Sequence, residues 1–92
     1  HVPTADDHLL VGGTAFQADA GMCGDYNSVI GMEKNASIAN FHRKFPRQRL
    51  APADGAATLC GTFLETDPST GLATRVEPIR IGGRLQQQMP SL

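Results

Sequence analysis

An α+β fold with one amphipathic helix and a terminal β-hairpin is predicted by the pattern of apolar and turn-forming residues in this chain of 92 residues. Two stretches rich in Thr, Leu, Val and Ile, residues 57–66 and 72–81, flank the run Asp67-Pro68-Ser69-Thr70-Gly71, whose residues favour turns. This arrangement is typical of a hairpin. Apolar residues recur at three- and four-residue spacing within 33–44, which indicates one helix.

The N-terminal part is predicted to form a short hairpin followed by a loop. Residues 8–11 and 14–18 are expected to pair as strands around Gly12-Gly13, because glycine accepts the positive φ angles of a tight turn. Within 19–27, glycines, aspartates and an asparagine interrupt regular structure. Residues 28–31 are too short for more than a turn or an edge strand.

The predicted helix runs from Glu33 to Lys44 and ends before Pro46. Ile38, Phe41 and Phe45 share one face, and we expect that face to be buried against the sheet. A basic cluster follows at the end of this helix and consists of Arg43, Lys44, Arg47 and Arg49. It is interpreted either as a phosphate contact or as a solvated helix end. The balanced net charge of the chain favours the solvated end.

The last part of the chain contains two further signals. Pro78 has no N–H to donate to a ladder, so its strand is expected at a sheet edge or a bulge. Residues 84–92 contain glutamines and a proline without periodicity, and we expect this tail to be frayed.

Composition narrows the class of partner. The formal net charge of −1 provides no field that attracts a nucleic-acid duplex or an anionic membrane. Cys23 and Cys60 are too few for a disulfide framework and form no Cys-x-x-Cys pair, which favours reduced cysteines in a cytoplasmic protein. Four phenylalanines, one tyrosine and no tryptophan are a thin supply for an independent core.

Several runs carry a resemblance to a known family. In order along the chain, they are His1-Val2-Pro3-Thr4-Ala5-Asp6, Gly12-Gly13-Thr14-Ala15-Phe16, Asp19-Ala20-Gly21-Met22-Cys23-Gly24, Ser28-Val29-Ile30-Gly31 and Ala57-Thr58-Leu59-Cys60-Gly61. They resemble the C-terminal part of the YmdB-type bacterial metallophosphoesterases of the calcineurin-like superfamily. Cys23 stands where that family usually has threonine, and Asp25 where it often has proline. The resemblance implies that residues 1–92 are one partial domain, the C-terminal block of a larger enzyme, and that they supply strands to a calcineurin-like β-sandwich.

The resemblance also implies a function. The family expectation is a hydrolase that cleaves phosphoesters, with 2′,3′-cyclic nucleotides as substrates and two divalent metal ions (iron, manganese or a similar metal) that generate the attacking hydroxide. A Thr-His-Thr-His motif precedes this block in the family, and its second histidine corresponds to His1, the expected metal ligand. Asp6 and Asp19 are expected to orient a metal-bound histidine, with turn and cap roles as the alternative. The remaining ligands and the catalytic acid are expected before His1, so this chain alone is expected to be inactive.

Two alternatives remain open. The chain can be a non-catalytic module for folding or for homo-oligomer contacts, with no active site of its own. An N-terminal histidine can also chelate copper through its amine and ring, with His8 or His42 completing the site.

Overall fold

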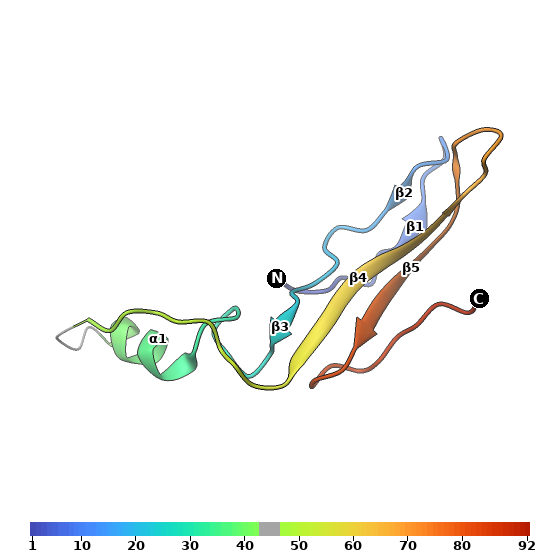
Figure 1. Cartoon of the computed structure of the whole chain (residues 1–92). Helices are drawn as coiled ribbons and strands as arrows, with labels where there is room; N and C mark the ends of the chain where they lie inside the picture. The colour runs from blue at the N-terminus through green and yellow to red at the C-terminus, as the bar shows by residue number, and fades with distance from the viewer. Residues whose placement is uncertain (43–46) are drawn as a thin grey trace.

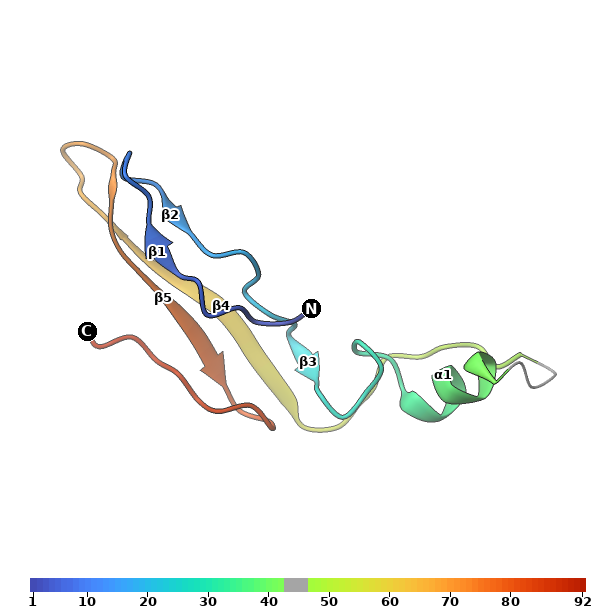
Figure 2. The same cartoon turned by 180° about the vertical axis from the view of Figure 1, so that it is seen from behind.

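The computed structural model describes residues 1–42 and 47–92 and has an elongated shape (Figures 1 and 2). Its principal extents are 60 × 24 × 18 Å and its radius of gyration is 17.7 Å. A compact domain of this length has a radius of gyration of about 12 Å. The molecule consists of a body of β-strands and an arm that carries helix α1 (Lys34–Phe41).

The body is built on the long antiparallel hairpin that the sequence predicts. Strand β4 (Ala57–Thr66) pairs with β5 (Ala73–Ile81) along almost its whole length. The connecting turn is closed by the Gly71 N–H, which donates to the Asp67 carbonyl at 2.7 Å. Both strand boundaries agree with the prediction to within one residue.

A short strand that the sequence does not predict extends this sheet. Strand β3 (Gly24–Asp25) pairs with Ala57 and Thr58, which gives the strand order β3-β4-β5. The side chain of Asp25 accepts hydrogen bonds from the N–H groups of Asn27 and Gly55. Because this pairing joins residues more than thirty positions apart, the local loop signals of residues 19–27 could not reveal it.

The predicted N-terminal hairpin is present and is shorter than expected. Strands β1 (His8–Leu9) and β2 (Ala15–Phe16) pair antiparallel and lie beside β5 (Figures 1 and 2). The Gly13 carbonyl accepts a hydrogen bond from the Ala73 N–H at 2.8 Å, which joins the turn of this hairpin to the start of β5.

The prediction that the helix packs its apolar face against the sheet is wrong. Helix α1 begins after the cap residue Glu33, whose carboxylate accepts hydrogen bonds from two main-chain N–H groups of the first turn. The arm then carries the helix away from the strands (Figure 1), so Ile38 is 48% exposed and Phe41 is 83% exposed. Periodicity identified the helix, but it does not tell which surface lies opposite its apolar side. The expected burial of Phe45, and the structure of residues 43–46 generally, lie outside the described residues.

The tail is ordered along β5, which corrects the expectation of a frayed end. Arg80 and Gln88 exchange two main-chain hydrogen bonds of 2.9 Å. The guanidinium of Arg80 also donates to the Gln86 carbonyl at 3.2 Å and to the Gln88 side chain at 2.7 Å. The main-chain N–H and C=O of Arg80 point away from β4, because both bond to Gln88. Pro78 lies two residues earlier in β5, so its nitrogen, which carries no hydrogen, faces the same outer edge. Of the two alternatives predicted for Pro78, a sheet edge or a bulge, the edge is confirmed, since β5 is the last strand in the order β3-β4-β5.

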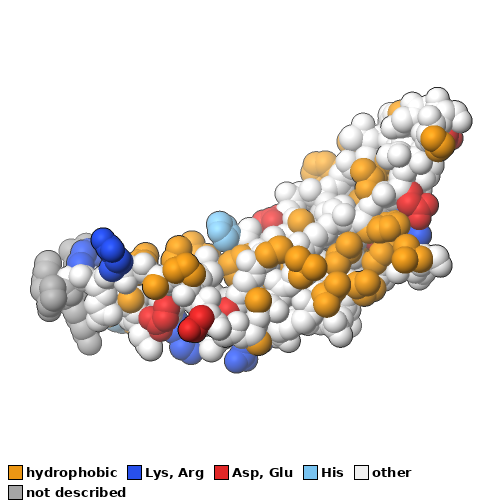
Figure 3. Space-filling view, in the orientation of Figure 1, with side chains coloured by type: hydrophobic (Ala, Val, Ile, Leu, Met, Phe, Trp, Pro, Cys, Tyr) orange, Lys and Arg blue, Asp and Glu red, His pale blue; other side chains and the backbone are white. Residues whose placement is uncertain are grey.

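The described residues bury few large side chains. The buried hydrophobic residues are Ala36, Cys60 and Val76, and Thr58 is 1% exposed. Hydrophobic side chains instead form a band over the visible face of the long hairpin (Figure 3). Among residues 1–42 and 47–92, no helix is long and apolar enough to cross a membrane.

Candidate functional site around His1

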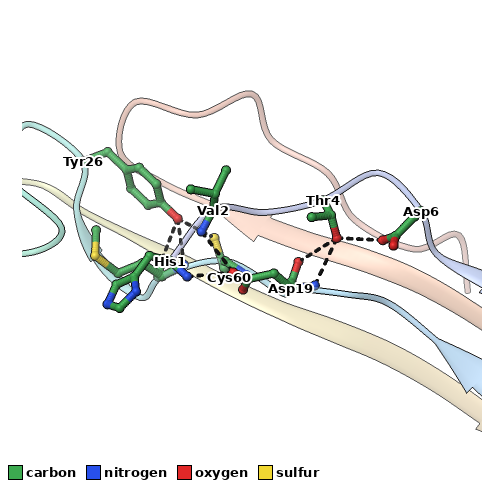
Figure 4. A network of polar contacts seen from close by, with 9 residues as sticks. His1, Val2, Thr4, Asp6, Asp19, Tyr26 and Cys60 are labelled. Atoms are coloured by element: carbon green, nitrogen blue, oxygen red, sulfur yellow. Dashed lines mark hydrogen bonds and ion pairs between the residues drawn. The ribbon is translucent and has the colours of Figure 1, made fainter.

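Asp19 fixes the main chain that carries the His1 ring. Its Oδ2 lies 2.7 Å from the amino terminus of His1 and accepts a hydrogen bond of 3.2 Å from the Val2 N–H. Its Oδ1 accepts a hydrogen bond of 2.8 Å from the Gly21 N–H (Figure 4 shows the contacts around Asp19). The amino terminus of His1 has the largest effect, and with the Gly21 and Val2 N–H groups it lowers the pKa of Asp19 to about 2. The side chain is therefore a charged clamp on backbone nitrogens.

Asp6 belongs to the same network through Thr4 (Figure 4). The Thr4 hydroxyl lies 2.6 Å from Asp6 Oδ1 and accepts a hydrogen bond of 3.0 Å from the Asp19 N–H. Asp6 Oδ1 also accepts the Ala18 N–H at 3.1 Å. The Thr4 hydroxyl, and secondarily the Ala18 N–H, lower the pKa of Asp6. The two aspartates singled out in the sequence are thus brought together in one structural network beside His1.

A hollow of about 410 Å³ opens next to His1. The residues that line it come from the first segment, from the loop around β3 and from the tail; they are His1, Val2, Pro3, Met22, Tyr26, Ser28, Ile30 and Leu85. Most of these side chains are apolar or aromatic. The hollow therefore suits an uncharged group more than a phosphate.

Tyr26 is held in a fixed orientation at this hollow. Its hydroxyl donates to the Met22 carbonyl at 3.0 Å and accepts from the Met22 N–H at 2.8 Å. The same oxygen lies 3.4 Å from Cys60 Sγ. Burial, followed by the hydrogen bond with Cys60, raises the pKa of Tyr26. The phenol therefore stays protonated at neutral pH and acts as a structural anchor for its ring.

The predicted turn within 28–31 forms the opposite part of the hollow. Val29 and Met32 exchange two hydrogen bonds of 2.9 Å, so Ile30 and Gly31 are the two central residues of a tight hairpin turn. Their φ angles are 44° and 93°. Among the described residues, Ile30 is the one non-glycine residue with positive φ. A β-branched side chain in this region is a true outlier, and backbone strain of this kind is concentrated at functional sites.

The donor groups near His1 fit one metal ligand and do not fit a whole site. The His1 side chain is 64% exposed, so its imidazole is accessible. Within residues 1–42 and 47–92, no group of three or more His, Cys, Asp or Glu residues could hold a metal ion. His8 Nδ1 lies 2.6 Å from the Asp6 carbonyl, and His42 ends helix α1 on the distant arm. A copper site that joins His1 to either histidine therefore has no support in the described residues.

Sequence reasoning did not identify the residues that shape the hollow. Met22, Tyr26 and Ile30 lie within or beside the runs that carry the family resemblance, so a signal for them was present. Leu85 had none, because the tail was expected to be frayed. Its position follows from the hydrogen bonds that hold residues 86–88 against Arg80.

Comparison with known proteins points to one family. A family model described as YmdB-like protein matches residues 1–79. The chain is 38% identical over 81 residues to the 2′,3′-cyclic-nucleotide 2′-phosphodiesterase of Bacillus subtilis (strain 168), which covers 88% of this chain and 30% of that protein. It is 38% identical over 82 residues to a putative phosphatase/phosphodiesterase of Mycoplasma pneumoniae, with coverages of 88% and 29%. The chain thus spans about 30% of the length of the curated relatives it matches.

Two solved structures share the fold of the chain. A hypothetical protein from Thermus thermophilus matches with a TM-score of 0.78 and 34% identity, over 91% of this chain and 32% of that one. A phosphatase from Mycoplasma pneumoniae matches with a TM-score of 0.78 and 37% identity, over 89% of this chain and 29% of that one. The elongated arrangement of strands and arm is therefore shared with larger proteins.

Proposed function

The chain belongs to the YmdB-like protein family, and from this membership we propose that it is the C-terminal block of a phosphodiesterase roughly three times its length. The observation that carries the proposal is the 38% identity with the Bacillus subtilis enzyme over 81 residues. The proposed substrates are 2′,3′-cyclic nucleotides, the class in the name of that relative. The whole protein is called the full-length enzyme below.

In the full-length enzyme, His1 is proposed as one ligand of a pair of divalent metal ions, iron, manganese or a similar metal. The exposed imidazole and the fixed main chain behind it support this role, because a ligand must be accessible and its backbone rigid. The metal pair would supply neutralisation of phosphoryl charge and activation of the attacking water. Asp19 and Asp6 are proposed to position His1 through the main chain, since the Asp19 carboxylate accepts a hydrogen bond from the Val2 N–H and the Asp6 carboxylate accepts one from the Ala18 N–H.

The remaining part of the full-length enzyme is proposed as the partner of the sheet. Side chains of a strand alternate between faces, so Leu59 lies on the face opposite to buried Thr58 and Cys60. Leu59 is 55% exposed, which suits a face that joins a calcineurin-like β-sandwich. The free state of both cysteines agrees with a cytoplasmic location, which we also propose.

Hydrolysis by the full-length enzyme and by residues 1–92 tests this proposal. Each is assayed with 2′,3′-cyclic AMP and with a chromogenic phosphodiester, with excess manganese and with chelator. Metal-dependent turnover is expected from the full-length enzyme and none from residues 1–92. Turnover by residues 1–92 above the chelated blank, or none by the metal-loaded full-length enzyme, would contradict the proposal.

A second candidate role is contact between subunits through α1. This role is supported by an apolar hollow of about 350 Å³ on the arm, which is lined by Val29, Ser37, Ile38, Phe41 and His42. Large exposed apolar side chains in one place mark interaction surfaces. Sedimentation of the full-length enzyme with and without the Phe41→Ser exchange tests this role: a lower oligomeric state in the variant supports it, and an unchanged state removes it.

A further inference from the structure

We propose that the hollow beside His1 is a binding site for the nucleobase of the substrate. The inference rests on the proposed function, because it needs a nucleotide phosphate held near His1. In a 2′,3′-cyclic nucleotide the ribose separates the phosphate from the base, so the site for the base must adjoin the metal ligand and differ from it. The hollow meets this condition, since His1 is itself one of its walls.

The size and chemistry of the hollow fit a base. Its volume of about 410 Å³ lies within the range of roughly 300 to 1,000 Å³ found for small-molecule sites. Bases are held by stacking between aromatic and apolar side chains. Tyr26 supplies an aromatic ring, and Met22 and Ile30 supply apolar surface.

The aromatic wall is built before any ligand arrives. Both hydrogen bonds between the Tyr26 hydroxyl and Met22 restrict rotation of the ring. The same bonds hold the Met22 main chain. The Met22 sulfur lies against Gly31, and a Cβ added at Gly31 would lie 3.1 Å from that sulfur. A fixed aromatic surface binds more tightly than a mobile one, because less conformational entropy is lost.

Ile30 is a costly choice for its position unless its side chain has a role. A turn with two positive φ angles favours asparagine or glycine at its first central residue. Ile30 has φ 44° and is 65% exposed, so neither backbone preference nor packing within residues 1–92 explains it. It does line the hollow. Contact with a ligand explains why an apolar, strained residue stands at this edge.

One residue of the hollow comes from the tail, which lies after the residues that the family model matches. Leu85 lines the hollow, whereas the family model matches only residues 1–79. Arg80 holds the following residues 86 and 88 in place. The third wall is therefore supplied by the segment after the matched region.

The test compares a substrate with a base and one without. The full-length enzyme is assayed with 2′,3′-cyclic AMP and with methyl riboside 2′,3′-cyclic phosphate, and the measured quantity is the ratio of the two kcat/KM values. Because the base stacks in the hollow, we expect kcat/KM to be at least about fivefold higher for 2′,3′-cyclic AMP than for the substrate without a base. Ile30→Asn, which keeps a residue suited to the turn, should lower this ratio, because it removes one apolar wall of the hollow. Ile38→Asn, the same exchange on the arm, should keep the wild-type ratio.

Several outcomes would overturn the proposal. A wild-type ratio near one, or an equal ratio in wild type and Ile30→Asn, would remove the base from this hollow. A lower melting temperature of Ile30→Asn with an unchanged ratio would mean that the rest of the enzyme fills the hollow. If wild type hydrolyses neither substrate, the proposed function fails, and calorimetry of adenosine binding then tests the base site by itself. Binding of adenosine that Ile30→Asn weakens supports the base site. No binding of adenosine refutes it.

Discussion

Replacing Gly21 by alanine should destabilise the full-length enzyme by about 2 to 5 kcal/mol, from two separate costs. Gly21 has φ 103°, in the region that disfavours side chains, and this backbone cost is about 1 to 2 kcal/mol. An added Cβ would also lie 2.8 Å from Cys60 Sγ and 3.0 Å from Pro3 Cβ. Relief of such an overpacked contact costs about 1 to 3 kcal/mol more. The contact matters for the site because Cys60 also touches Tyr26.

Two other glycines separate these costs. Gly71 has φ 74° with nothing within 4 Å of an added Cβ, so Gly71→Ala should cost only the backbone term of about 1 to 2 kcal/mol. Gly61 also has open space and lies in strand β4 without a positive φ, so Gly61→Ala should change stability by less than about 1 kcal/mol. Urea unfolding of all three variants gives the comparison. A loss for Gly21→Ala no larger than that for Gly71→Ala would refute the close packing of residue 21 on Cys60.

Two further predictions concern Phe41 and Asp19. Phe41→Ala should change the stability of residues 1–92 by less than about 0.5 kcal/mol, because the ring is 83% exposed; a loss above about 2 kcal/mol in urea unfolding would restore the buried face that the sequence predicts. The pKa of Asp19 is lowered from 3.8 to about 2, so the stability it contributes is complete above pH 3.8 and is lost as the pH falls through about 2. The difference in unfolding midpoint between residues 1–92 and Asp19→Asn should therefore disappear on acidification through this window; a constant difference would show that the charge of Asp19 is not responsible.

The elements predicted well are those specified by nearby residues. Strands β4 and β5 follow from two β-favouring runs around the turn at Asp67, and Glu33 marks the start of the helix through its own side chain. Strand β3 was missed because its partners Ala57 and Thr58 lie far along the chain. The exposure of Phe41 was missed because amphipathic spacing shows which residues share a face and leaves open what that face contacts.

For the candidate site, the sequence identified positions and missed their arrangement. Asp6 and Asp19 were singled out, yet their shared bonds with Thr4 depend on two segments lying side by side. The hollow required Tyr26 and Leu85, which are 59 positions apart, to reach one place. Leu85 does so through the pairing of Arg80 with Gln88, and a glutamine-rich tail carries no periodic signal that would reveal it.

The metal content of the full-length enzyme with His1→Ala tests the central claim most directly. If His1 is a ligand of one of two metals, elemental analysis should find lower occupancy and kcat should collapse, because catalysis of this type needs both ions. The melting temperature of the metal-free protein should hardly change, since the His1 side chain is 64% exposed within residues 1–92 and contributes little packing to them. Full occupancy with normal turnover in the variant would contradict the account and remove His1 from the site.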